Sequence, residues 1–114
     1  MGSRFAELVI DCAQPEELAR FWAAVLGGQM VRDKYGCVQV GTGEGPRLTF
    51  IEVPEAKAGK NRLHIDLSPV GCAQADEVER LLSLGGMRMD VGQGDVSWVV
   101  LADPEGNEFC VLAA

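Results

Sequence analysis

Residues 12–20 read CAQPEELAR, and residues 72–80 repeat the pattern as CAQADEVER. Each copy follows a short alternating run, residues 7–11 and 63–67, and leads into an apolar helical pattern that stops at a glycine pair. A strand followed by a helix, repeated in this way, predicts two similar small modules within one domain. We expect a functional site where the two modules meet.

The first module is predicted over about residues 4–53 in the order β-α-β-β-β. Residues 5–12 alternate in polarity and predict a half-buried strand. The helix is expected to begin at Pro15 and to stop at the glycines that follow Leu26, because proline suits a first turn and glycine adopts a left-handed end. Its apolar stripe comprises Leu18, Phe21, Trp22, Val25 and Leu26. Further strands are expected near residues 29–33, 36–41 and 47–53.

Residues 54–62 are polar and locally basic, and they are interpreted as a linker. The second module, residues 63–114, then repeats the same order of elements. Its helix is predicted over 74–84, and its strands over 63–68, 87–91, 96–102 and 107–113. The fold class is therefore α+β, with two tandem β-α-β-β-β modules that form a curved mixed sheet around a cavity, and residues 1–114 make one domain.

The chain of 114 residues has a formal net charge of −7, which disfavours nucleic acid and anionic membranes as partners. It contains no apolar run of the roughly 20 residues that span a bilayer and no signal-peptide pattern, so a cytoplasmic protein is expected. The cysteines lack the close spacing of a zinc or disulfide framework and are interpreted as small buried residues in a reducing compartment. They are Cys12, Cys37, Cys72 and Cys110.

Three segments carry a resemblance to a known group of proteins: Phe21-Trp22, residues 60–67 (KNRLHIDL) and residues 98–110 (WVVLADPEGNEFC). With the paired modules, they resemble the glyoxalase/bleomycin resistance/extradiol dioxygenase group, the vicinal oxygen chelate superfamily. The nearest branch is the glyoxalase-like group of small bacterial proteins. The resemblance implies a small-molecule ligand and a homodimer, and it admits enzymes and pure binding proteins alike.

In that superfamily, metal ligands stand on the first and last strands of each module. The resemblance thus implies Glu7 and His64 as metal ligands, for a divalent ion such as Zn, Ni, Mn or Fe. The remaining positions depart from the pattern, since Arg47 stands where a carboxylate is expected and Cys110 where a glutamate is expected. Glu108 lies two residues before Cys110 on the same strand face. We therefore expect a degenerate metal site and no firmly bound cofactor.

Three residues are candidates for proton transfer: Glu7, His64 and Glu108. Candidate ligand-binding residues are Arg47, Asp66, Trp98 and Cys110. Each has a plainer alternative: His64 can hydrogen-bond Asp66 as a wall residue, and Arg47 can pair with Glu7 or Glu108. Trp98 can stack on a planar ligand or fill the core, and Cys110 lacks an identifiable activating partner for a role as nucleophile.

These features favour a protein that binds a small organic molecule in the cavity between the modules. The alternative is a lyase or isomerase of the glyoxalase type that uses Glu7, His64 and Glu108, with or without a divalent metal. A scaffold without a ligand is the third hypothesis.

Overall fold

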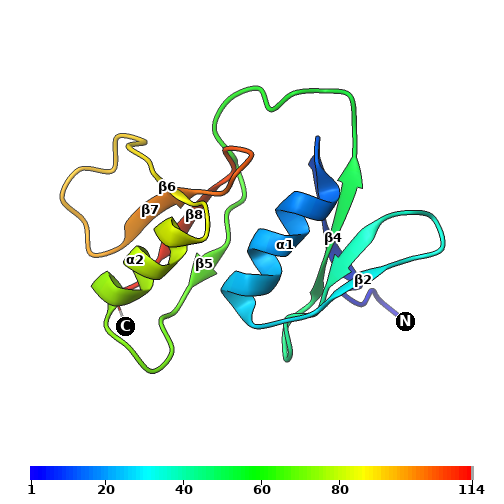
Figure 1. Cartoon of the computed structure of the whole chain (residues 1–114), viewed down its shortest axis with the longest axis horizontal. Coiled ribbons are helices and arrows are strands. Elements are labelled where there is room, and N and C mark those ends of the chain that lie inside the picture. The colour runs from blue at the N-terminus through cyan, green and yellow to red at the C-terminus, as the bar shows by residue number, and fades with distance from the viewer. Residues whose placement is uncertain (114) are drawn as a thin grey trace. The chain divides into compact units, whose positions relative to one another are not determined.

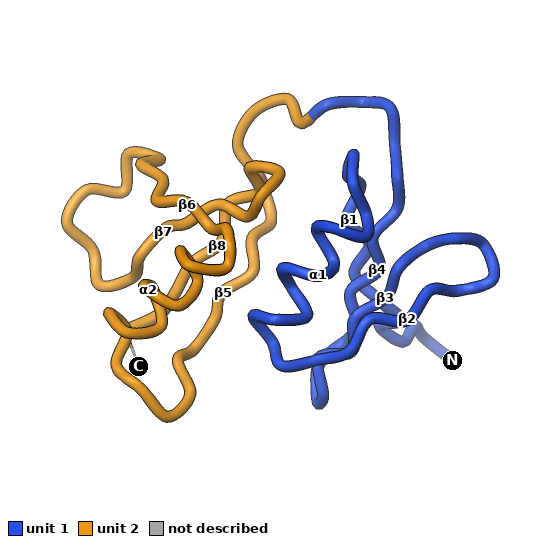
Figure 2. Tube along the Cα trace, in the orientation of Figure 1, with its two compact units in different colours: residues 1–56 blue, residues 57–114 orange. Residues whose placement is uncertain are grey.

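The computed structural model describes residues 1–113. It divides into two compact units, residues 1–56 and 57–114 (Figure 2). The boundary falls inside the segment predicted as a linker. Each unit contains one helix and one four-stranded mixed sheet (Figure 1), which confirms the predicted α+β class with repeated β-α-β-β-β modules. Neither helix within residues 1–113 is long and apolar enough to cross a membrane.

Unit 1 contains a sheet with the strand order β1-β4-β3-β2. Its elements are β1 (Glu7–Cys12), α1 (Pro15–Leu26), β2 (Met30–Arg32), β3 (Val38–Val40) and β4 (Arg47–Glu52). Strand β1 pairs in parallel with β4, and the other pairs are antiparallel. All five elements lie within their predicted ranges, although the strands are shorter than expected at their ends.

Helix α1 begins and ends where the sequence predicts. Pro15 stands in its first turn, and Gly27 closes it with a φ of 69°, a left-handed conformation that glycine adopts without strain. Gly28 is required for a different reason, because a Cβ at this position would lie 2.3 Å from the carbonyl oxygen of Gly41. The predicted stripe is buried except at Leu26, which is only partly covered. The helix packs on β3 and β4 (Figure 1).

The sheet of unit 1 has one apolar and one polar face. Register pairs Leu8 with Leu48 and Ile10 with Phe50, so these side chains share one face. Fully buried Phe50 and Val40 show that this face forms the core of the unit, as the alternation of β1 predicts. The other face carries Glu7, Arg47 and Thr49 among its residues.

Unit 2 repeats the topology with the strand order β5-β8-β7-β6. Its elements are β5 (Asp66–Leu67), α2 (Gln74–Ser83), β6 (Met87–Arg88), β7 (Val99–Ala102) and β8 (Glu108–Val111). Strand β5 pairs in parallel with β8. Gln74 ties the start of α2 to the sheet, because its Nε2 donates to the carbonyl oxygen of Val111 at 3.0 Å. Helix α2 and the sheet contribute the buried side chains Val78, Leu81, Leu101, Phe109 and Val111.

The strands of unit 2 are shorter than predicted, and in the segment after β6 side chains hydrogen-bond the loop backbone. The strand predicted over 96–102 begins only at Val99. The strand predicted over 87–91 ends at Arg88. After it, Gln93 accepts a hydrogen bond from the backbone N–H of Val91, and Asp90 accepts one from that of Gly92, both at 2.8 Å. Such local bonds compete with a β-ladder. Strand β5 is also limited to two residues, and Leu63 is exposed rather than part of the apolar face.

The cysteine prediction is confirmed for Cys12 and Cys110, which are buried, and is wrong for Cys72, which is exposed. Cys37 is intermediate. The difference between the repeated cysteines follows from the length of the first strand in each unit. Cys12 is the last residue of β1, whereas β5 ends at residue 67 and leaves Cys72 in the connection to α2.

Candidate functional site

A pocket of about 370 Å³ lies on the sheet of unit 2. Its polar lining consists of Lys60, His64, Asp66, Gln93, Glu108 and Cys110. Its apolar lining consists of Val91, Trp98, Val100 and Leu112. Five of the predicted site residues, His64, Asp66, Trp98, Glu108 and Cys110, therefore line one pocket.

Strand pairing brings these side chains to one face of the sheet. Asp66 of β5 is the register partner of Cys110 in β8, and Val100 of β7 is its partner on the other side. Glu108 lies two residues before Cys110 and thus points to the same face. The predicted common face of Glu108 and Cys110 is confirmed, because both line the pocket.

His64, Asp66 and Cys110 form a compact cluster on this face. His64 Nδ1 lies 2.8 Å from Asp66 Oδ1 and 3.9 Å from Cys110 Sγ. Both neighbours therefore contact the same ring nitrogen. A Cys-His-Asp nucleophile triad needs the two nitrogens of the imidazole to face different partners, so this arrangement does not build one.

Cys110 is a protonated thiol near neutral pH in this environment. Burial raises its pKa, and the negative charge of Asp66 together with a hydrogen bond to Asp66 raises the pKa further. The positive charge of Lys60 opposes these effects but does not outweigh them. Since the thiolate is the reactive form of cysteine, the structure does not support Cys110 as a ready nucleophile.

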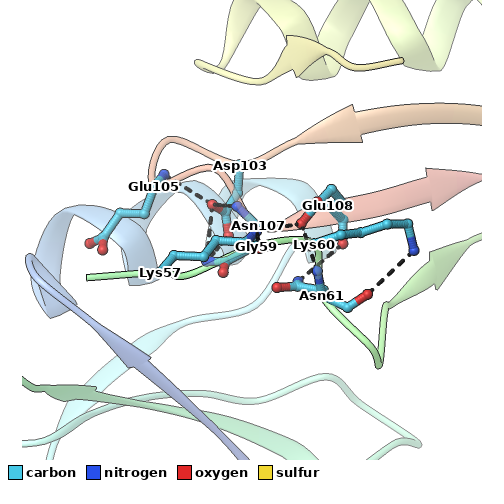
Figure 3. Close-up of polar contacts among 8 residues, drawn as sticks. All are labelled: Lys57, Gly59, Lys60, Asn61, Asp103, Glu105, Asn107 and Glu108. Atoms are coloured by element: carbon cyan, nitrogen blue, oxygen red, sulfur yellow. Dashed lines mark hydrogen bonds and ion pairs between the residues drawn. The ribbon is translucent and has the colours of Figure 1, made fainter. Parts of the chain in front are cut away.

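Glu108 is held by the segment that precedes β5 (Figure 3). Lys57 Nζ lies 3.0 Å from Glu108 Oε1, and the backbone N–H of Asn61 donates to the same oxygen at 3.2 Å. Burial by itself raises the pKa of Glu108, but the hydrogen bonds from Lys57 and from backbone amides outweigh it and lower the pKa. An ionised carboxylate that accepts hydrogen bonds from two donors is a weak base. Glu108 is therefore suited to forming the pocket wall rather than to accepting a proton.

The turn between β7 and β8 sets the position of Glu108. Asp103 is fully buried, and its Oδ1 accepts hydrogen bonds of 2.9 Å from the backbone N–H groups of Glu105 and Asn107. The side-chain amide of Asn107 donates to both carboxylate oxygens of Asp103. Asp103 and Asn107 therefore serve as turn residues.

The two remaining candidates, Glu7 and Arg47, lie in unit 1 and contact each other. Thr49 Oγ1 donates to Glu7 Oε1, and Arg47 Nε lies 3.6 Å from the same oxygen. The interpretation of Arg47 as a partner of Glu7 is thus confirmed. A guanidinium beside the carboxylate is unfavourable for a nearby metal cation. The residues of unit 1 therefore do not fit the metal ligands that the resemblance implied there.

The sequence of this chain matches the glyoxalase-like domain family over residues 7–112. The chain belongs to this family. Among curated proteins, none matches this glyoxalase-like chain in sequence. Solved structures with the same fold include proteins of the wider glyoxalase, bleomycin resistance and dioxygenase group, which confirms the resemblance noted from the sequence.

Three solved structures illustrate the similarity of the glyoxalase-like chain to this group. The fosfomycin resistance protein FosX from Mesorhizobium loti is 14% identical with a TM-score of 0.75, over 100% of this chain and 94% of FosX. A glyoxalase/bleomycin resistance protein/dioxygenase family enzyme from Burkholderia phytofirmans PsJN is 16% identical with a TM-score of 0.75, over 96% and 97% of the two chains. FosX from Listeria monocytogenes, complexed with Mn(II) and 1S,2S-dihydroxypropylphosphonic acid, is 13% identical with a TM-score of 0.71. The match covers 100% of this chain and 92% of that FosX chain.

Sequence reasoning missed part of the pocket. Gln93 and Val91 were not singled out, because they belong to a loop that was predicted partly as strand. Lys57 was predicted only as part of the basic linker. Its proximity in sequence to Asn61, another partner of Glu108, offered no local signal that both residues contact β8, which lies 47 or more residues further along the chain.

Proposed function

We propose that this glyoxalase-like protein binds a small organic molecule in the pocket of unit 2. The observation that carries this proposal is an open pocket that is lined by both apolar side chains, Trp98 among them, and polar or charged ones. A volume of about 370 Å³ suits a small metabolite or drug fragment. Trp98 is 41% exposed although it lies on the pocket wall, so its indole face is accessible to a ligand.

The lining indicates the kind of molecule that the pocket would accept. Trp98, Val100 and Leu112 would cover an apolar or planar body. Lys60 and the His64–Asp66 pair would contact a polar group at the other end. FosX proteins, which share the fold, include one complexed with a small phosphonic acid, and this is consistent with small-molecule binding.

Thermal-shift measurements with matched probes test this proposal. Benzoate, benzylamine and benzyl alcohol share a ring but carry a negative, a positive and no charge, so they separate the contributions of Lys60 and Asp66. A diverse library of metabolites and antibiotics extends the search. We expect at least one probe class to raise the Tm in proportion to its affinity. If no compound raises the Tm or alters Trp98 fluorescence, the pocket is not a binding site.

We expect Trp98→Ala to weaken binding of a ring-containing probe by about tenfold or more, because stacking on an aromatic ring and its apolar area are lost. Isothermal titration calorimetry measures the change in Kd. Tyr35→Ala is the matched control, since Tyr35 is also an exposed aromatic residue but does not line the pocket. Equal affinities for the two variants would contradict the assignment of Trp98 to the ligand site.

A second function, enzymatic proton transfer of the lyase or isomerase type, is favoured by the His64–Asp66 contact. A carboxylate 2.8 Å from a ring nitrogen orients an imidazole for proton transfer. Glu7 and Glu108 both pair with cations, Arg47 and Lys57, whereas His64 contacts a carboxylate, and we therefore assign the proton transfer to His64. This function requires that a bound compound is chemically converted.

Mass spectrometry of each stabilising compound, before and after incubation, separates the two functions. If turnover occurs, we expect His64→Gln to lower kcat by at least about a hundredfold, as the loss of a general base does. Glu7→Gln should leave kcat within about twofold in that case. Unchanged turnover in His64→Gln would rule out His64 as the base, and an absence of conversion would favour the binding function.

We also propose that the protein is a cytoplasmic homodimer, on the basis of its family. Sedimentation-velocity analysis checks this assembly. A single species at the mass of one 12.2 kDa chain over a broad range of concentrations would contradict the dimer.

A further inference from the structure

We propose that the pocket of unit 2 binds a small monocarboxylate whose short apolar chain ends in a ring, and that Lys60 selects the carboxylate. This inference rests on the proposed binding function and adds to it the class of ligand. It follows from the way in which the charged and apolar lining residues are distributed along β8.

The lining residues of β8 extend from one end of the pocket to the other. Glu108, Cys110 and Leu112 line the pocket at alternate positions of this chain segment. Leu112 directly follows β8 and is still paired, because its backbone N–H donates to the carbonyl oxygen of Leu67 at 2.8 Å. An extended chain rises about 3.3 Å per residue, so the Cα atoms of Glu108 and Leu112 are about 13 Å apart. The two ends of the pocket can therefore contact different parts of one ligand.

The end of the pocket at Leu112 is apolar. Val99 of β7 is the register partner of Val111, so Trp98, one residue earlier in this antiparallel pair, is level with Leu112. Val100 lines the pocket next to them. The indole of Trp98 is partly exposed here, so the ring of a ligand can stack on it.

The end of the pocket at Glu108 is charged, and Lys60 belongs to it (Figure 3). Asn61, the next residue, donates its backbone N–H to Glu108 Oε1 at 3.2 Å. Lys57 Nζ lies 3.0 Å from the same oxygen. Lys57, Lys60 and Glu108 together carry two positive charges and one negative charge. This end of the pocket therefore has one positive charge available to an anionic group of a ligand.

Lys60 is the charged lining residue whose hydrogen-bonding capacity is least used. Its Nζ donates to the carbonyl oxygen of Asn61 at 3.3 Å, and within residues 1–113 it forms no ion pair. The carboxylate of Asp66, in contrast, has hydrogen bonds with His64 and Cys110. The other lining carboxylate accepts the two hydrogen bonds described above. An incoming carboxylate would therefore bind the free donors of Lys60.

The charges of the pocket also favour a ligand with a single negative charge. Asp66 is the register partner of Cys110, in the middle of the lining, and its carboxylate repels additional negative charge. A carboxylate carries one negative charge at pH 8, whereas a phosphonate carries more than one. We therefore expect 4-phenylbutyrate to bind more tightly than 4-phenylbutylphosphonate, and the reverse order would contradict the assignment of a monoanion.

Isothermal titration calorimetry with matched probes tests the proposal. The probes 4-phenylbutyrate, 4-phenylbutanamide and 4-phenylbutylamine share a ring and a chain but are anionic, neutral and cationic, and benzoate lacks the chain. We expect 4-phenylbutyrate to bind at least about tenfold more tightly than each of the others. Equal or tighter binding of the amide or the amine would overturn the choice of a carboxylate and leave the pocket a binding site. Equal binding of benzoate would overturn the need for a chain.

Lys60→Met should raise the Kd of 4-phenylbutyrate by about tenfold and leave that of 4-phenylbutanamide within about twofold. Lys60 is exposed and methionine keeps an apolar stem, so an unchanged Tm is expected. Lys34→Met is the matched control, since Lys34 is an exposed lysine of unit 1 that does not line the pocket.

Two results would count against the role of Lys60 or against the pocket itself. An unchanged Kd of 4-phenylbutyrate in Lys60→Met, or an equal increase in Lys34→Met, would overturn the selection by Lys60. If these probes fail and other compounds bind, only the class of ligand is wrong. If no compound of any class binds, both this inference and the proposed function are overturned.

Discussion

The substitution Asp103→Ala is expected to lower the free energy of unfolding by about 3 kcal/mol, measured by urea denaturation. The carboxylate is fully buried and accepts hydrogen bonds from the backbone N–H groups of Glu105 and Asn107. Its removal leaves these donors without their acceptor, and each buried donor without a partner costs about 1–3 kcal/mol. Because the turn leads into β8, the variant should also disturb the pocket and reduce probe binding.

Asp33→Ala is the matched control for this prediction. Asp33 Oδ1 accepts hydrogen bonds from the backbone N–H groups of Tyr35 and Cys37, in the same turn pattern as Asp103. Asp33 is only partly buried, so water can replace its hydrogen bonds. We expect a loss of about 1 kcal/mol or less. Equal losses in the two variants would show that burial of Asp103 is not the source of its effect.

The substitution Glu108→Gln is expected to lower the free energy of unfolding by about 2 kcal/mol at neutral pH. The side chain of Glu108 is 8% exposed, and that of its partner Lys57 is 28% exposed, so solvent screens the pair only in part. An amide keeps the shape of the carboxylate but leaves the ammonium group of Lys57 uncompensated. The double variant with Lys57→Met should recover part of the loss, and a recovery of zero would show that the two side chains do not interact.

The same pair predicts how stability responds to acid. The pKa of Glu108 is lowered in the folded protein from its ordinary value of 4.5. Its contribution to stability is therefore complete above the unfolded-state pKa and is lost as the pH falls through the lowered folded-state pKa. The wild-type protein should lose more stability than Glu108→Gln between pH 6 and pH 3, in urea denaturations at each pH. Parallel pH profiles would contradict this assignment.

Much of the fold follows from local patterns in the sequence. The stripe of α1 and the alternation of β1 were predicted correctly, because the period of a helix or strand is written in consecutive residues. The same reasoning placed Glu108 and Cys110 on a common strand face, and both line the pocket. Strand lengths were overestimated in unit 2, where side chains such as Gln93 hydrogen-bond the backbone of their own loop.

Local sequence patterns were enough to specify the repeated modules, their order of elements and which side chains share a strand face. The contacts between distant segments were set by strand pairing in the folded chain. The parallel register of β5 with β8 brings Asp66 opposite Cys110, and the loop before β5 places Lys57 on Glu108. In unit 1, the register of β1 with β4 brings Arg47 opposite Glu7. These pairings join residues about 40 or more positions apart, and no local periodicity encodes such long-range contacts.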